Sequence, residues 1–166
     1  FPRLVIPLAV VLTAVFNLGL NLVVVFGFLL VAGVGPMWSW LGLPLLLALL
    51  MILTTAVATL VAALYPRFRD TGIIWGVVVT ALFYATPVLY PIDIVSGTLQ
   101  DLIALNPLAP IFELARKWVI DPDAPGPVAV SNGGLALIVP VVIFVGVCVL
   151  AVWVFRREAP RIAEEL

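Results

Sequence analysis

The sequence predicts an all-α integral membrane protein with four transmembrane helices and two short helices before the last span. Of the 166 residues, 64% are hydrophobic and only 10% are charged, and the mean hydropathy is +1.30. Soluble domains carry about 25% charged residues, so this composition excludes an ordinary soluble domain. Each of four apolar stretches is long enough to supply the ~20 residues that a helix needs to cross a bilayer.

The first two expected spans cover residues 5–34 and 41–64. The first exceeds one bilayer thickness, which predicts that its helix tilts, kinks or begins in the interface. Between the spans, residues 33–36 (GVGP) break the helix, and the two tryptophans that follow are typical of the headgroup level. The second span carries a face of small residues that favours close packing with another helix, made by Ala48, Thr55, Thr59 and Ala62.

Polar side chains recur every four residues in the first span and share one face of the expected helix, at Thr13, Asn17 and Asn21. An asparagine amide that faced lipid would lack a hydrogen-bond partner, so this face should meet protein or water. Two interpretations remain open. The stripe either bonds to a neighbouring helix or lines a transport path.

A compact charged cluster precedes the third expected span, residues 71–90, within which no charged residue occurs. The cluster consists of Tyr65, Pro66, Arg67, Phe68, Arg69 and Asp70. It either anchors the helix end at the membrane surface or contacts a partner outside the membrane. Pro87 should bend or end the helix near its far side. Small residues at four-residue spacing predict a helix-packing face, formed by Gly72, Gly76 and Thr80.

The segment 92–134 is more polar than the rest of the chain. It predicts two short amphipathic helices, at residues 96–105 and 108–120, which the pair Asn106-Pro107 separates. Neither helix is long enough to span a bilayer, so each should be interfacial or re-entrant. In the second, Glu113 and Lys117 have the i,i+4 spacing of an ion pair.

The last expected span covers residues 135–155, and Arg156, Arg157 and Arg161 follow it. With four spans, six arginines fall on one side of the membrane, whereas Arg116 and Lys117 fall on the other. The positive-inside rule places the six-arginine side in the cytoplasm. Both ends of this sequence and the 65–70 cluster are then cytoplasmic, and the two short helices are extracytoplasmic.

The composition also excludes several kinds of chemistry. The sequence has no histidine, so histidine-based catalytic pairs and cysteine–histidine metal sites are absent. No glycine-rich phosphate loop precedes the only lysine, Lys117, and no basic tract is long enough for nucleic acid. The spans carry no Asp, Glu, Lys, Arg or His at mid-depth, which argues against a proton-driven antiporter. We expect no catalytic residue, metal or bound cofactor, and energy for any uphill transport must come from a partner.

Several motifs resemble those of permease subunits of bacterial ABC-2-type transporters, particularly exporters of polysaccharides such as O-antigen, teichoic acid and galactan. They are FPR at 1–3, YPRFRD at 65–70, TPVLYP at 86–91 and LNPLAPIFELAR at 105–116. The RFRD and NPLAP parts are the more specific. The motifs follow the family's order and extend over most of the chain. Six spans are usual in such permeases, so the resemblance implies that this is the C-terminal part of a longer protein.

The resemblance implies roles for the two polar regions. The 65–70 cluster corresponds to the loop that contacts a cytoplasmic ABC ATPase, which would bind ATP and Mg. Residues 96–120 correspond to an extracytoplasmic gate, with Asn106, Pro107, Glu113 and Arg116 as its candidate residues. Two permease copies would pair with two ATPase subunits in the bacterial cytoplasmic (inner) membrane and export a lipid-linked glycan. An ABC-2 exporter of small amphiphiles or drugs and a non-transporting membrane scaffold are the alternatives.

Transport by such a permease would be relay and gating, in which closure of the ATPase pushes the 65–70 cluster. The helix at 71–90 would carry the movement outward to the gate. Aromatic rings offer flat faces to passing sugars, and the candidates are Trp75, Phe83, Tyr84 and Tyr90. Packing and interfacial anchoring are the alternative roles for these rings.

Overall fold

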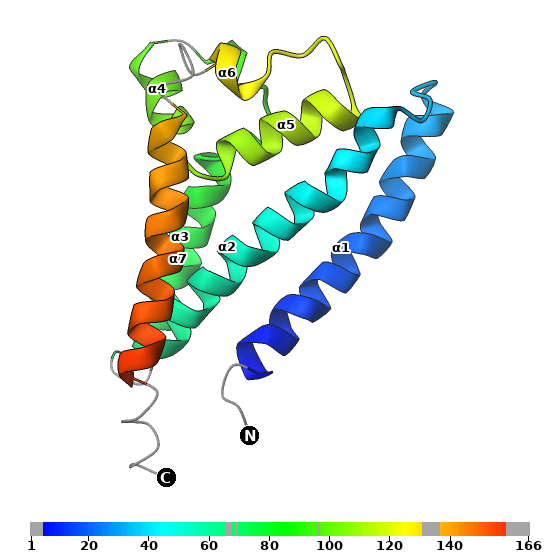
Figure 1. Cartoon of the computed structure of the whole chain (residues 1–166). Helices are drawn as coiled ribbons and strands as arrows, with labels where there is room; N and C mark the ends of the chain where they lie inside the picture. The colour runs from blue at the N-terminus through cyan, green and yellow to red at the C-terminus, as the bar shows by residue number, and fades with distance from the viewer. Residues whose placement is uncertain (1–4, 66–67, 69, 96, 131–136, 159–166) are drawn as a thin grey trace.

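Helices form all of the regular structure in the part of the chain that is described, in agreement with the predicted all-α fold (Figure 1). The computed structural model describes residues 5–65, 68, 70–95, 97–130 and 137–158. Three helices within these ranges are long and apolar enough to cross a membrane. They are α1 (Val5–Val31), α2 (Leu43–Leu64) and α7 (Ile138–Glu158).

The third expected span is shorter than the sequence predicts. α3 (Thr71–Tyr84) has 14 residues, roughly 21 Å of helix, whereas the hydrocarbon core is about 30 Å thick. The helix stops before Thr86-Pro87, because a proline disfavours the helical conformation in the residue before it. The segment 85–90 forms turns and bends instead. A continuous helix over 71–90 is therefore not observed.

α1 ends in a Schellman motif, in which two backbone hydrogen bonds enclose a residue in the left-handed conformation. Gly33 has a φ of +87°, its amide donates to the Leu30 carbonyl at 3.1 Å, and the Val34 amide donates to the Leu29 carbonyl at 2.9 Å. Glycine adopts this conformation at little cost. The motif stops the helix before the predicted boundary and turns the chain toward a 3₁₀ helix, η1 (Trp38–Gly42).

α2 packs against α7 through small residues. Ala56 and Thr59 on α2 and Ala151 on α7 are each 8% exposed or less. Small side chains let two helix backbones approach closely, as the sequence predicts for Thr59. The two helices diverge toward their N-terminal ends, where α5 (Ala109–Val119) lies across the gap (Figure 1).

Short helices form a layer across one end of the bundle (Figure 1). They are η2 (Ile92–Ile94), α4 (Thr98–Ala104), α5 and α6 (Pro127–Val130). α4 and α5 lie inside the ranges 96–105 and 108–120 expected for the two amphipathic helices, with Asn106-Pro107 in the turn between them. The apolar residues that α5 buries include Ala109, Ile111 and Val119.

The C-terminal end of α5 is fixed to the start of α2. The Trp118 ring lies so close to Gly42 that a Cβ there would overlap the ring, and the Ser39 hydroxyl donates to the Trp118 carbonyl at 2.6 Å. The Phe26 and Trp40 rings, with centroids 4.5 Å apart, connect α1 to the same region. Space alone excludes a side chain at Gly42, because its φ of −76° suits any residue.

We predict that Gly42→Ala destabilises the full-length protein by about 1–3 kcal/mol, the usual cost of overpacking. The added methyl group would displace Trp118 and loosen the contact between α2 and α5. Thermal unfolding in detergent measures the effect. Gly35→Ala is the matched control, because a Cβ at Gly35 meets nothing within 4 Å. Equal stability of the two variants would show that Trp118 moves aside without cost.

Candidate functional site

A buried ion pair on α5 faces the turn segment that follows α3. Arg116 Nη1 donates to Glu113 Oε1 at 3.0 Å. Glu113 is only 2% exposed, whereas the Arg116 side chain is 19% exposed. The ion pair therefore has i,i+3 spacing, and the predicted pairing of Glu113 with Lys117 is replaced by one with Arg116.

The same guanidinium also holds two backbone carbonyls of the turn segment. Arg116 Nη2 donates to the Pro87 oxygen at 3.2 Å and to the Tyr90 oxygen at 3.0 Å. Such carbonyls need a donor when they are buried outside a helix. Arginine suits this role because its planar fork presents five N–H groups in fixed directions. One side chain thus joins a carboxylate on α5 to two points of the turn.

Asn106 makes a second connection to the turn. Its Nδ2 donates to the Ala85 carbonyl at 3.1 Å and to Thr86 Oγ1 at 2.9 Å, while its Oδ1 accepts from the Leu108 amide at 3.0 Å. The Thr86 hydroxyl in turn donates to the Leu82 carbonyl at 2.7 Å. One side chain, Asn106, therefore bonds both to a carbonyl at the C-terminal end of α3 and to an amide at the start of the turn into α5.

Glu113 reaches a third element, because the Ile92 amide donates to its Oε1 at 3.4 Å. Ile92 is 1% exposed. The space beside Glu113 has a volume of about 10 Å³, room for one water at most. We call this set the polar clamp: Thr86, Asn106, Glu113, Arg116 and the carbonyls of Ala85, Pro87 and Tyr90. Its side chains bond to one another and to backbone carbonyls, so its chemistry is to hold segments together.

The predicted partner-contacting cluster lies at the other end of α3. Tyr65 and Phe68 are 59% and 55% exposed, and the Thr71 hydroxyl donates to the Phe68 carbonyl at 2.6 Å. The Asp70 carbonyl accepts two amides of the first turn of α3. The remaining members, Pro66, Arg67 and Arg69, lie outside the described residues. α3 thus has this cluster at its start and the polar clamp at its end.

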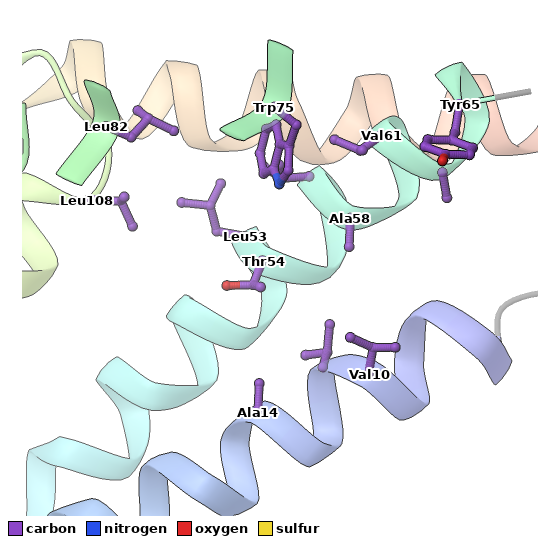
Figure 2. A pocket seen from close by; sticks show the side chains of 13 residues that line it. Val10, Ala14, Leu53, Thr54, Ala58, Val61, Tyr65, Trp75, Leu82 and Leu108 are labelled. Atoms are coloured by element: carbon purple, nitrogen blue, oxygen red, sulfur yellow. The ribbon is translucent and has the colours of Figure 1, made fainter. Parts of the chain in front are cut away.

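An apolar groove of about 590 Å³ lies between α1, α2 and α3. Figure 2 shows Val10 and Ala14 from α1, Leu53 and Ala58 from α2, and Trp75 from α3 along its walls. Trp75 is the residue of the predicted path that lines this groove within the described part of the chain. Its indole gives the groove an aromatic wall.

The other expected path residues lie elsewhere. Thr13, Asn17 and Asn21 are exposed on α1 and do not line the groove. The Asn21 amide donates to the Asn17 carbonyl at 2.9 Å, so the helix itself supplies the partner that the sequence interpretation sought in a neighbour. Phe83 and Tyr84 pack edge to face with centroids 5.5 Å apart. The structure does not bring these residues together with Trp75, and their place in a path stays a prediction.

The small-residue face of α3 is open within this chain. A Cβ on Gly76 would meet nothing within 4 Å in the described residues, and one on Gly72 would meet only the Tyr65 ring at 3.6 Å. The Thr80 hydroxyl donates to the Gly76 carbonyl of its own helix. The close helix contact predicted for Gly72, Gly76 and Thr80 is thus not made between described residues, and a contact with a second chain stays a prediction.

Comparison with known proteins gives consistent matches for the region that holds both the cluster and the clamp. Residues 2–119 match the family described as ABC-2 type transporter. The O-antigen export system permease protein RfbA of Klebsiella pneumoniae is 34% identical over 110 residues, and that of Myxococcus xanthus is 33% identical over 114 residues. These alignments cover 66% and 65% of this chain but 42% of each relative. The matched region is therefore less than half the length of these relatives.

We predict that Arg116→Met destabilises the full-length protein by roughly 3–5 kcal/mol, because it removes the cation from the buried Glu113 carboxylate. The double variant Arg116→Met/Glu113→Leu should recover much of that loss, since it removes both charges. Chemical or thermal unfolding in detergent measures both. Lys117→Met, on the same helix but outside the clamp, is the control and should unfold like wild type. A double variant no more stable than Arg116→Met would show that the charge on Glu113 does not cause the instability of Arg116→Met.

Proposed function

This chain belongs to the ABC-2 type transporter family, and we propose on that premise that it is permease sequence of an ATP-driven exporter of a lipid-linked polysaccharide. The names of its relatives, O-antigen export permeases, support a cell-envelope glycan as the substrate. A separate cytoplasmic ATPase supplies the energy, binding ATP and Mg itself. This chain contributes no catalytic residue and acts by relay and gating.

The placement of α3 between the 65–70 cluster and the polar clamp is the observation that carries this proposal. The ATPase docks on the cluster, and its closure pushes on the start of α3. A helix of roughly 21 Å transmits the push to the turn at its far end. Because Arg116 and Asn106 hold that turn by its carbonyls, the movement passes directly to α5.

The clamp also supports a re-entrant position for α4 and α5. Non-helical backbone is tolerated at membrane depth only where protein or water satisfies its polar groups. The carbonyls of Ala85, Pro87 and Tyr90 have such partners in the clamp. We propose that α3 and the turn together make the fourth crossing, and that α4 and α5 form the gate on the extracytoplasmic side. The 65–70 cluster and the arginine end of α7 then face the cytoplasm.

A second permease copy completes the transport path in this proposal. The open face at Gly76 supports a close helix contact with that copy, because nothing in the described chain occupies it. The groove beside Trp75 lies between the same helix and its neighbours α1 and α2. Two ATPase subunits, one for each permease, then act on the two copies of α3.

We predict that replacing Arg67 and Arg69 together by alanine weakens binding of the ATPase or uncouples ATP hydrolysis from export. The change removes the charged contacts that receive the push. Co-purification, ATPase rate and glycan export by the full-length complex in vesicles are the readouts. Arg157→Ala removes an arginine beyond the last span and should leave coupling intact. Normal assembly, hydrolysis and export in the double variant would disprove docking at this cluster.

We predict that Asn106→Asp lowers glycan export by about tenfold or more while the complex still assembles and hydrolyses ATP. The substitution keeps the side-chain shape but replaces the Nδ2 donor by an oxygen that faces the Ala85 carbonyl. Loss of these two hydrogen bonds, of which one is exposed and one is partly buried, costs about 1–3 kcal/mol, and 1.4 kcal/mol corresponds to a factor of ten. Lys117→Met, outside the clamp, should export normally. Unchanged export by Asn106→Asp would refute the relay through the clamp.

A further inference from the structure

A second groove lies between α2 and α7, on a different set of α2 side chains from the groove beside Trp75. Its volume is about 600 Å³. The walls include Thr55 and Thr59 from α2 and Cys148, Val152 and Arg156 from α7. The proposed path and gate use none of these residues, so the groove needs its own explanation.

The walls of this groove are apolar along its length. The Thr55 and Thr59 hydroxyls donate to the carbonyls of Met51 and Thr55 in their own helix, both at 2.7 Å, so neither hydroxyl needs a hydrogen-bond acceptor from a ligand. On α7 the groove runs from Cys148 to Arg156, roughly 12 Å at 1.5 Å per residue. A long apolar slot of this kind suits a single hydrocarbon chain.

An exposed cation, Arg156, lies at one end of the slot. Arg156 is exposed, and its guanidinium makes no hydrogen bond or ion pair with the described residues. The next residue, Arg157, differs because its guanidinium lies over the Trp153 ring, 5.2 Å from the centroid. Guanidinium groups bind phosphate through two parallel hydrogen bonds. An apolar slot that ends at an exposed arginine, which has no partner among the described residues, matches an acyl chain with a phosphate at its head.

We propose that the groove between α2 and α7 binds an anionic glycerophospholipid of the surrounding membrane. One acyl chain lies along Thr55, Cys148 and Val152, and the phosphate pairs with Arg156. Charge favours this occupant over an apolar helix, which would cover the guanidinium without supplying a counter-charge. The lipid would bridge α2 and α7 and so stabilise the contact between these two helices.

Lipid binding to the full-length permease–ATPase complex tests this proposal by native mass spectrometry with added phosphatidylglycerol. Arg156→Gln should weaken binding of one phosphatidylglycerol by about tenfold, the usual effect of losing a charge-assisted contact. Arg157→Gln is the matched control, with the same loss of charge one residue away, and should bind like wild type. Equal weakening in both variants, or equally tight binding of phosphatidylethanolamine to the wild type, would overturn the proposal.

Two further measurements test whether the lipid binds in the groove between α2 and α7. Val152→Phe should also weaken phosphatidylglycerol binding, because it fills the slot and leaves every charge in place. A benzophenone attached to Cys148, in a complex without other cysteines, should form a photo-adduct with phospholipid. An adduct with a polyprenyl phosphate or with a protein segment would assign the groove to substrate or to a protein contact, and would overturn the phospholipid site.

Discussion

The hydrogen bonds from Arg116 to two backbone carbonyls are the contacts on which the arrangement of this chain depends. Once α3 ends, the following turn carries carbonyls that no helix satisfies. In a membrane protein such groups are costly unless the protein itself provides donors. The Arg116 guanidinium donates hydrogen bonds to the carbonyls of Pro87 and Tyr90, and the Asn106 side-chain amide donates one to the carbonyl of Ala85. The short helices can therefore follow α3 directly instead of extending it across the bilayer.

α5 is held at both ends, which limits how it can move. Asn106 precedes its first turn, Glu113 and Arg116 lie in its middle and last turns, and its last residues are fixed to the start of α2 by the bond from Ser39 and by the packing of Trp118 on Gly42. It therefore bridges α3 and α2 and does not hang as an independent flap. In the proposed exporter, a displacement of α3 would therefore reach both α5 and the start of α2.

α2 lines a groove on each of two faces. One face lines the groove with Trp75, next to the helix that the ATPase would push. The other packs on α7 and lines the groove that ends at Arg156. The threonine hydroxyls of the second face donate to carbonyls of their own helix. These small side chains therefore line the groove without presenting an unbonded hydroxyl hydrogen. This division would let one side of the bundle move while a lipid stabilises the other.

The sequence by itself determined the helical membrane fold and the approximate bounds of most helices, because apolar run length and breaking residues such as Gly33 and Pro87 act locally. It also singled out Asn106, Glu113 and Arg116. Only the tertiary structure decided how they are used. Helix periodicity allows Glu113 to pair with either Arg116 or Lys117. Every residue has a backbone carbonyl, so the sequence does not reveal which carbonyls the side chains bind. The clamp depends on the position of a turn more than twenty residues away, which local pattern does not encode.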